Sequence, residues 1–463
     1  MKLISKVRFD ALASYARHPG APLLGLELAW LASVDEGVLA VFVVDTDGEF
    51  SAQVLARDLK ERYRWVTATA FSTKPMEALA DLQLTVDQLL SSLEEERSQG
   101  DEVGKPVDFF TPVRPAGKLH PAFVALATTE GYAPARGIIE PMMRWYDDAD
   151  GNFVEQFQTT GFDARIWELY LFAALSEVGY GFDRSFATPD FVAQGLRGEF
   201  CVEATTVHPT MDDGQAVPAP SPTTPEELVT YAREYLPIRY AGPLTTKLKK
   251  RYWEQPHVAD KPLLFAIQDF HEPMSMTWSR TALPTYLYGY VHAAKRESDG
   301  SLTIIATKVA THSFREKEIP SGFFYQPDAE HVSAVLFNNS GTIAKFNRMG
   351  VIAGFGSEDL VLVRQGTAFN PDPNASEPEP FVHVVNKEYV EAWLEGMDVY
   401  HNPRARNPLD PEMLPGAVHH RLLEDGRVES VGDRWQPLTS VTAIMAMRGA
   451  VSARDSNAET SGA

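Results

Sequence analysis

The sequence predicts a globular α/β protein of more than one domain, in which a mixed sheet is flanked by helices. The chain has 463 residues, of which 44% are hydrophobic, and this length exceeds what one hydrophobic core ordinarily fills. Short apolar runs with strand character alternate with longer segments that have helical spacing. We expect four parts: an N-terminal α/β domain over residues 1–100, a core over 119–320, a strand-containing C-terminal extension over 321–450 and a disordered tail over 451–463.

The N-terminal domain is predicted from one strand, its neighbour and one helix. Residues 38–44 are a continuous apolar run that stops at the turn signal of residues 45–48, so we expect a buried strand with a hairpin partner at 50–55. Residues 75–93 have leucines at helical spacing. Residues 98–118 are polar and contain glycine and proline, which predicts a linker to the core.

The C-terminal part contains two further strand candidates. Residues 302–306 and 332–337 have strand composition, and they indicate either a further sheet or an extension of the core sheet. Residues 370–378 are rich in proline and asparagine and are predicted to form a loop.

Composition excludes several classes of protein. The chain has 42 Lys and Arg against 63 Asp and Glu, a formal charge of -21, so it repels a phosphate polyanion at long range and needs a local basic groove to bind nucleic acid. A single cysteine, Cys201, excludes a disulfide framework and a multi-cysteine zinc site. The sequence shows neither a secretory start nor a membrane span, so we expect a cytoplasmic location.

One charge interrupts an otherwise apolar helix. Residues 166–175 are apolar all round except for Glu168, which predicts a helix packed on most sides and ending at Gly179. Desolvating a carboxylate costs free energy unless a metal, a cation or a polar cleft receives it. Glu168 is therefore either a functional acid or a buried partner of Arg165.

Two strands follow this helix, and each carries an acid. The first begins at Pro189-Asp190, and a loop at 194–198 leads into the second at 199–207. Alternation gives the second strand one face with Cys201, Glu203 and Thr205 and another with Phe200, Val202 and Ala204. Glu203 is thus a charge within an apolar strand.

At these residues the sequence resembles the PD-(D/E)XK nuclease superfamily. The pattern of that family is a helix with a Glu, then Pro-Asp at the start of a strand, then an acid and a Lys two residues apart on the neighbouring strand. Glu168, Pro189-Asp190 and Glu203 match in order and spacing, over about 45 residues directly or about 90 if the helix and strand that follow are included. The resemblance implies a restriction-endonuclease-like mixed sheet flanked by helices.

The resemblance also implies a function. It is the metal-dependent hydrolysis of a phosphodiester, as in a DNA endonuclease, with an analogy to prokaryotic restriction or defence. Asp190, Glu203 and the Ala204 carbonyl would hold Mg²⁺ or Mn²⁺, and Glu168 would take a metal-bound water or a second ion.

The chain departs from the family at the lysine, because Thr205 occupies its position. A replacement cation is available in residues 242–253, where Pro243 suits a first helical turn. Lys247 borders the predicted buried stripe of that helix and is the first choice for the catalytic cation, with Lys250 as the second. The stripe consists of Leu244, Leu248 and Tyr252. The alternative is that these lysines belong to a solvated helix face.

Two further interpretations stay open. The chain could be a catalytically inactive module of the same fold, acting as a scaffold or nucleic-acid-binding subunit with a protein partner or as a homo-oligomer. Cys201 is interpreted as a small core residue and not as a nucleophile. Asp269 and His271 close a core strand and could line the cleft, but we expect them to be solvated and leave them outside the main site.

Overall fold

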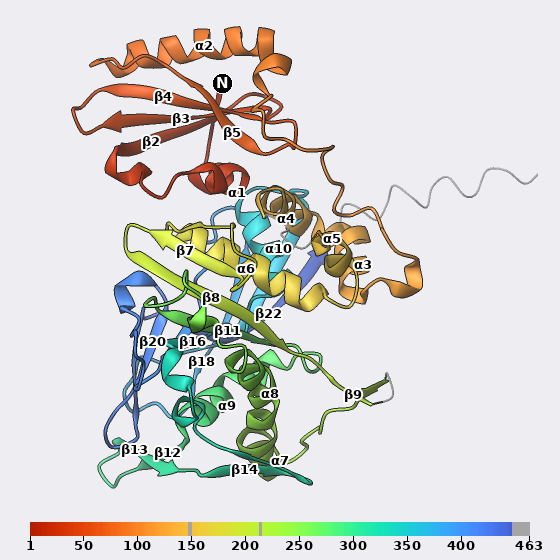
Figure 1. Cartoon of the computed structure of the whole chain (residues 1–463), viewed down its shortest axis with the longest axis vertical. Helices are drawn as coiled ribbons and strands as arrows, with labels where there is room; N and C mark the ends of the chain where they lie inside the picture. The colour runs from red at the N-terminus through yellow and green to blue at the C-terminus, as the bar shows by residue number, and fades with distance from the viewer. Residues whose placement is uncertain (147–150, 213–214, 447–463) are drawn as a thin grey trace, which may run out of the picture.

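The computed structural model describes residues 1–146, 151–212 and 215–446. Its helices and strands form a mixed α/β structure with several sheets, in which an N-terminal unit lies above a central sheet (Figure 1). No helix within these ranges has both the length and the apolar character needed to cross a bilayer. The predicted tail over 451–463 lies outside the described residues.

The N-terminal unit is an antiparallel sheet covered by helices on both faces. Its strands lie in sequence order: β1 (Lys2–Ile4), β2 (Gly25–Ala32), β3 (Val38–Asp45), β4 (Phe50–Arg57) and β5 (Tyr63–Ala68). Alternation along β3 turns Val38, Ala40 and Phe42 toward α2 (Pro75–Glu96). Leu39 and Val41 pack on the opposite face with α1 (Lys6–Ala13). The predicted strand, its hairpin partner and the helix are all confirmed.

The central sheet has eight strands in the order β21-β20-β19-β16-β11-β8-β7-β6. Strands β6 to β8 form an antiparallel meander, and β11 runs parallel to both β8 and β16. The bounds are β6 (Gly181–Phe182), β7 (Phe191–Gly195), β8 (Gly198–Val207), β11 (Leu263–Asp269), β16 (Ala334–Phe337), β19 (Asp398–His401), β20 (Val418–Leu422) and β21 (Val428–Val431). Strand β11 is buried along its whole length, as expected for a parallel strand covered on both faces.

Helix α6 (Phe162–Glu177) covers one face of this sheet. All residues from Ile166 to Leu175 are buried, which confirms the prediction from their apolar composition. Gly179 follows with a φ of 93°, a left-handed conformation that suits glycine at a helix end. Helices α3 (Pro121–Thr128), α4 (Ala133–Trp145) and α5 (Phe153–Gln158) lie between the N-terminal unit and α6 in the chain.

The two predicted faces of β8 pack against different helices. Phe200, Val202 and Ala204 belong to the core that contains α6. Cys201 belongs to the core on the other side, together with Leu244 of α8 (Leu236–Leu248). Helix α7 (Pro225–Thr230) continues through a π-helical turn into α8, and α9 (Met276–Tyr288) lies beside it.

The two strand candidates of the C-terminal part, which the sequence assigned either to a further sheet or to the core sheet, take different places. Residues 334–337 form β16 of the central sheet, so this segment extends that sheet. Residues 302–308 pair only within a separate ribbon. Residues 370–378 contain no helix or strand, which confirms the predicted loop.

The remaining elements lie outside the central sheet. They are the ribbons β9 (Thr210–Asp212) with β10 (Gln215–Val217), β12 (Tyr290–Arg296) with β13 (Leu302–Lys308) and β14 (Thr311–Phe314) with β15 (Lys317–Pro320), the sheet β17 (Leu360–Ala368), β18 (Glu379–Val385) and β22 (Pro437–Ala446), and helix α10 (Ile343–Ile352).

Candidate functional site

Asp190 and Glu203 lie next to each other on neighbouring strands. The register of β7 and β8 pairs Phe191 with Val202, so Asp190 comes opposite Glu203. The main-chain N–H of Asp190 donates to Glu203 Oε2 at 3.3 Å, and the N–H of Ala204 donates to Asp190 Oδ2 at 2.7 Å. Glu203 is buried within this strand. The structure therefore brings together the two acids that the sequence singled out.

Glu168 faces the same region from α6 but has partners of its own. Arg165 donates to Glu168 Oε2 at 2.6 Å, and the Tyr146 hydroxyl donates to the same oxygen at 3.0 Å. The ion pair with Arg165, one of the two alternatives from the sequence, is thus present. Burial raises the pKa of Glu168 nonetheless, against the opposing effect of Arg165.

Asp190 is the acid whose pKa is raised by the charges of the other two. The pKa of Asp190 is raised to about 8, mainly by burial and in addition by the negative charges of Glu203 and Glu168. Lys247 and the hydrogen bond from Ala204 act in the opposite direction. We call Glu168, Asp190 and Glu203 the acid cluster. A carboxyl that titrates near neutral pH within such a cluster is typical of functional sites.

Lys247 reaches this cluster from α8. Its ammonium lies 2.5 Å from Glu203 Oε1 and is mostly buried. The prediction that Pro243 begins the helix is wrong, because α8 starts at Leu236 and continues from the π-helical turn before it. Pro243 lies inside the helix, yet the buried positions Leu244 and Leu248 still set the direction of Lys247.

The other residues proposed for the lysine role are placed differently. Lys250 lies beyond the end of α8, is exposed, and has its ammonium 6.0 Å from the ring centroid of Tyr252. Among the described residues it makes no ion pair with an acid of the cluster. Thr205 is half-buried on β8, two residues after Glu203 and opposite Ile267 of β11.

Three partners of the acids were not predicted from the sequence. The Tyr252 hydroxyl donates to Glu203 Oε1 at 2.5 Å, although Tyr252 was assigned only to a buried stripe. Tyr146 binds Glu168 as described above. Arg184 donates from Nη1 to the main-chain oxygen of Asp190 at 3.0 Å. The apolar spacing of Tyr252 could have indicated its direction, whereas no local pattern marks Tyr146 or Arg184.

The expectation that Asp269 and His271 are solvated is wrong. Both are buried at the end of β11, and Asp269 Oδ1 lies 2.7 Å from His271 Nδ1. The Tyr231 hydroxyl lies 2.8 Å from His271 Nε2 and donates to Glu272 at 2.5 Å. Tyr231 belongs to the π-helical turn that covers the end of the strand, which explains the burial. These residues form a hydrogen-bonded group separate from the acid cluster.

Cys201 is fully buried beneath α8. Burial raises the pKa of its thiol to about 11, so the thiolate that a nucleophile requires is disfavoured. Its packing agrees with the interpretation as a small core residue.

The acid cluster has the donor chemistry of a Mg²⁺ or Mn²⁺ site. Asp190 and Glu203 supply carboxylate oxygens from paired strands, and the like charge between them is the repulsion that a divalent cation relieves. Among the described residues no group of three or more His, Cys, Asp or Glu is arranged as a metal site. Mg²⁺ commonly binds through one or two carboxylates together with water and phosphate oxygens, so the two acids and the Ala204 carbonyl suffice in number.

Comparison with protein-family models, with curated proteins and with solved structures finds no match to this chain. The function is therefore argued from the geometry and charge of the site.

Proposed function

We propose that this chain is a metal-dependent phosphodiester hydrolase of the DNA-endonuclease kind, resembling the PD-(D/E)XK nucleases. The observation that carries the proposal is the meeting of Asp190, Glu203 and Lys247 at one place on the central sheet. Two strands and a helix supply these three groups, and their charges are those that a metal and a phosphate require.

The order of elements supports the same proposal. Helix α6 carries Glu168, β7 follows directly after Asp190, β8 carries Glu203, and α8 and β11 come next. This is the order of helix, paired strands, helix and strand that the resemblance implies. The mixed sheet with helices on both faces agrees with the fold class expected from the sequence.

Each residue has a defined task under this proposal. Asp190 and Glu203 bind the divalent ion, which when bound lowers the pKa of water and neutralises charge on the phosphate. Tyr252 holds the Glu203 carboxylate in place through its 2.5 Å hydrogen bond. Lys247 replaces the family lysine: its flexible stem lets the ammonium move from Glu203 to a phosphate oxygen or to the attacking water. Glu168 stays paired with Arg165 at the edge of the site.

The contact between Lys247 and Glu203 also favours a second candidate function. The ammonium neutralises the carboxylate that would bind the ion, and Thr205 lacks the family charge. A catalytically inactive module with the same fold, used as a scaffold or nucleic-acid-binding subunit, would show the same ion pair. Divalent metal binding separates the two, because an active site requires it and a decayed one does not.

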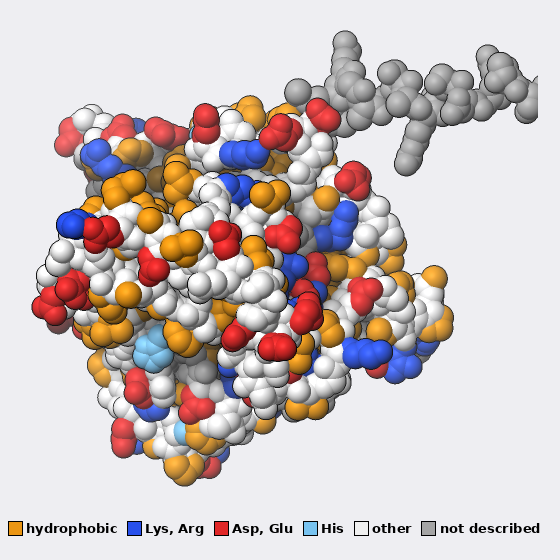
Figure 2. Space-filling model, turned by 90° about the horizontal axis from the view of Figure 1, so that it is seen from above, with side chains coloured by type: hydrophobic (Ala, Val, Ile, Leu, Met, Phe, Trp, Pro, Cys, Tyr) orange, Lys and Arg blue, Asp and Glu red, His pale blue; other side chains and the backbone are white. Residues whose placement is uncertain are grey.

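The proposed substrate, location and biological role rest on analogy with the PD-(D/E)XK nucleases. We propose DNA bound through a local basic groove, a cytoplasmic location and a role in prokaryotic restriction or defence. The face seen from above shows carboxylates scattered among Lys and Arg side chains (Figure 2). On that face the basic side chains are interspersed with acidic ones, and we propose that the groove lies around Lys247 instead.

A cleavage assay tests the proposal. Plasmid, linear and single-stranded DNA and RNA are incubated with the full chain and Mg²⁺ or Mn²⁺. We expect metal-dependent cleavage of at least one substrate, and its loss in Asp190→Ala and Glu203→Ala with the fold intact, because removing one acid relieves repulsion in the cluster.

The matched control is Glu199→Ala, an exposed acid on the same strand as Glu203. It should cleave like the unaltered chain. Full activity in either cluster variant would contradict the proposal, and so would unfolding of both, which indicates a structural ion pair instead.

A further inference from the structure

A loop with an exposed aromatic ring leads into the acid cluster. Residues 183–190 connect β6 to β7, and residues 185–188 of this loop are exposed. Phe186 lies among them, four residues before Asp190, and is 39% exposed. Four residues of chain span at most about 14 Å, a length that roughly four stacked nucleotides of one strand also cover. An aromatic ring therefore lies within a few nucleotides of the proposed metal site.

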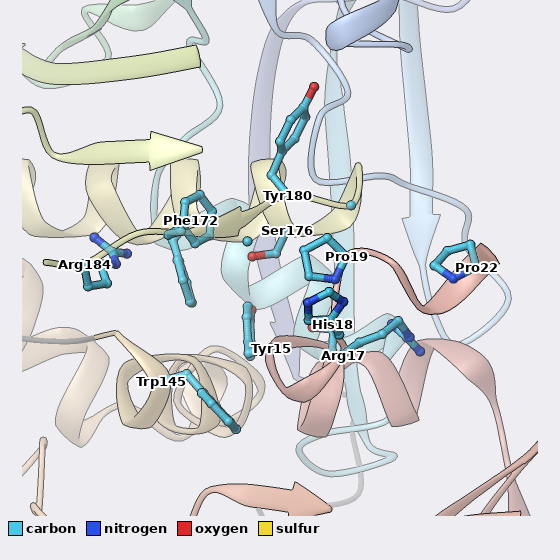
Figure 3. Close-up of a pocket in the computed structure, with 14 residues that line it drawn as sticks. Tyr15, Arg17, His18, Pro19, Pro22, Trp145, Phe172, Ser176, Tyr180 and Arg184 are labelled. Carbon is cyan, nitrogen blue, oxygen red and sulfur yellow. The ribbon is translucent and has the colours of Figure 1, made fainter. Parts of the chain in front are cut away.

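Contacts at both ends hold this loop in place. At its start, the Arg184 guanidinium is enclosed by aromatic rings, among them that of Phe172 at 5.6 Å (Figure 3), and it donates to the main-chain oxygen of Asp190 at 3.0 Å. Near its end, His257 Nε2 lies 2.7 Å from the main-chain oxygen of Thr188. A ring on a loop that is already held in place loses little conformational entropy when a ligand binds.

Phe186 has one ring face free. Its other face is stacked on His257, with the ring centroids 3.7 Å apart and an angle of 7° between the planes. Within the described ranges, no second ring and no cation lies against Phe186. Trp253 differs, because its ring is stacked on His331 and also lies 5.7 Å from the Arg251 guanidinium. Phe186 can therefore receive a further planar group, and a nucleobase of any identity stacks on such a face.

The segment that follows α8 connects this ring to both acids of the proposed metal site. Tyr252 donates to Glu203 at 2.5 Å. Five residues later, His257 carries the Phe186 ring and contacts the loop two residues before Asp190. A strand whose phosphate reaches the two acids would thus bring a neighbouring base to Phe186.

One cation beside this site has no counterion. Lys250 is exposed and forms no ion pair in the part of the chain that the structure describes, and its ammonium lies 6.0 Å from the Tyr252 ring centroid. Arg251 is neutralised instead, since it pairs with Glu254 at 2.7 Å. In a chain with a formal charge of -21, a free ammonium next to the tyrosine that holds Glu203 attracts a phosphate locally.

We infer that the substrate of this site is single-stranded DNA, with an unpaired base stacked on Phe186 and a backbone phosphate contacted by Lys250. The inference rests on the proposed function and narrows its substrate. In a duplex each base is paired and stacked on its neighbours, so a side chain reaches its face only after the base is extruded. A single strand offers that face without this cost, and stacking on an aromatic ring does not depend on which base it is.

Binding is measured on the full chain by fluorescence anisotropy at low salt with EDTA, so that cleavage plays no part. The labelled probes have equal length: a thymidine single strand, a duplex and an abasic strand, which has the same phosphates but no bases. We expect the thymidine strand to bind roughly tenfold more tightly than the abasic strand, the contribution of one stacked base, and more tightly than the duplex. Equal binding of the abasic strand, tighter binding of the duplex or no binding of any probe overturns the inference.

A substitution then locates the stacked base. Phe186→Leu keeps an apolar side chain and removes the ring, so it should weaken binding of the thymidine strand roughly tenfold, to the level of the abasic strand. Phe71→Leu is the matched control, because Phe71 is an exposed phenylalanine of the N-terminal unit, and it should bind like the unaltered chain. Unaltered binding in Phe186→Leu contradicts the inference. If that variant does not fold, the difference between the thymidine and abasic strands on the unaltered chain decides.

The outcome is separate from that of the hydrolase proposal. Base-dependent binding of the single strand without cleavage of any substrate would support the strand-binding site and contradict the hydrolase, which leaves the inactive nucleic-acid-binding module. Metal-dependent cleavage together with equal binding of the thymidine and abasic strands would support the hydrolase and overturn the role of Phe186.

Discussion

Two buried groups of charged residues in this molecule differ in sign: carboxylates outnumber cations in one, and cations outnumber carboxylates in the other. The acid cluster has three carboxylates with Lys247 and Arg165 beside them. A second group, the C-terminal ion network, has two carboxylates and three cations on and around α10: Lys345, Arg348, Arg364, Glu391 and Glu395. In that network Glu391 lies 2.7 Å from Lys345, 2.7 Å from Arg348 and 3.4 Å from Arg364.

The different number of neighbouring cations shifts the pKa of the central acid in opposite directions in the two groups. Burial would raise the pKa of Glu391, but its three cations hold the pKa well below the usual range. Burial and the neighbouring acids together raise the pKa of Asp190 to about 8. A network that satisfies its charges stabilises the fold, whereas a cluster that leaves repulsion between carboxylates is suited to bind a cation. The comparison thus separates a group whose central acid is paired with three cations from a group whose acids repel one another.

The largest effect on stability is expected in the C-terminal ion network. Glu391→Gln leaves three buried cations with one fewer counterion, and breaking a buried pair costs about 3–5 kcal/mol of unfolding free energy. Chemical denaturation measures this loss. Glu388→Gln, an exposed acid three residues earlier, should change it by less than about 0.5 kcal/mol. Equal stability of the two variants would show that the network is not structural.

The acid cluster should respond to substitution in the opposite direction. The pKa of Asp190 rises from 3.8 to about 8 on folding, so stability from its protonated form is present below about pH 4 and is lost as pH rises through about 8. Asp190→Asn removes this loss. Without metal, the variant should therefore gain on the unaltered chain between pH 4 and pH 8, by a few kcal/mol at most.

Denaturation at several pH values with EDTA checks the direction. Addition of Mg²⁺ at pH 8 should restore stability to the unaltered chain and not to Asp190→Asn, because the ion takes the place of the proton. A variant that is less stable than the unaltered chain at pH 8 would place Asp190 among the structural acids.

Replacement of Lys247, which contacts the acid cluster, should affect the cleavage rate and have less effect on stability. Lys247→Ala should lower the cleavage rate roughly a hundredfold, the scale of a group that acts on the reacting proton or charge. Metal affinity should change little, because the proposed metal ligands Asp190 and Glu203 stay in place. Lys249→Ala, an exposed neighbour, is the matched control and should cleave normally.

Thr205→Lys in the Lys247→Ala background should restore part of the rate, because residues two apart on β8 share a face. If Lys247→Ala and Lys250→Ala both cleave like the unaltered chain, the account of a displaced lysine is wrong.

The sequence could predict the pair of acids because their placement depends on local rules. A hairpin fixes which residues of β7 and β8 lie opposite each other, and alternation then decides the face that Glu203 takes. Lys247 could be predicted for a similar reason. The start of α8 was misjudged, yet the spacing of Leu244 and Leu248 sets the helix face whatever the first residue is.

The partners of the acids could not be predicted, because tertiary packing places them. Tyr146 comes directly after α4, 22 residues before Glu168 in the chain, and the spacing of apolar residues does not specify which hydroxyl meets a carboxylate. Tyr231 covers His271 from a π-helical turn 40 residues earlier. The order of the C-terminal strands in the central sheet depends on pairing over still longer separations.

The central claim is that Asp190 and Glu203 form a divalent metal site, and Mn²⁺ binding followed by electron paramagnetic resonance tests it without reference to cleavage. The account predicts that the full chain binds Mn²⁺ at neutral pH, that Mg²⁺ competes, that Asp190→Asn and Glu203→Gln abolish binding, and that Glu199→Ala does not. Binding that is absent from the unaltered chain, or equal in all four proteins, would contradict the account.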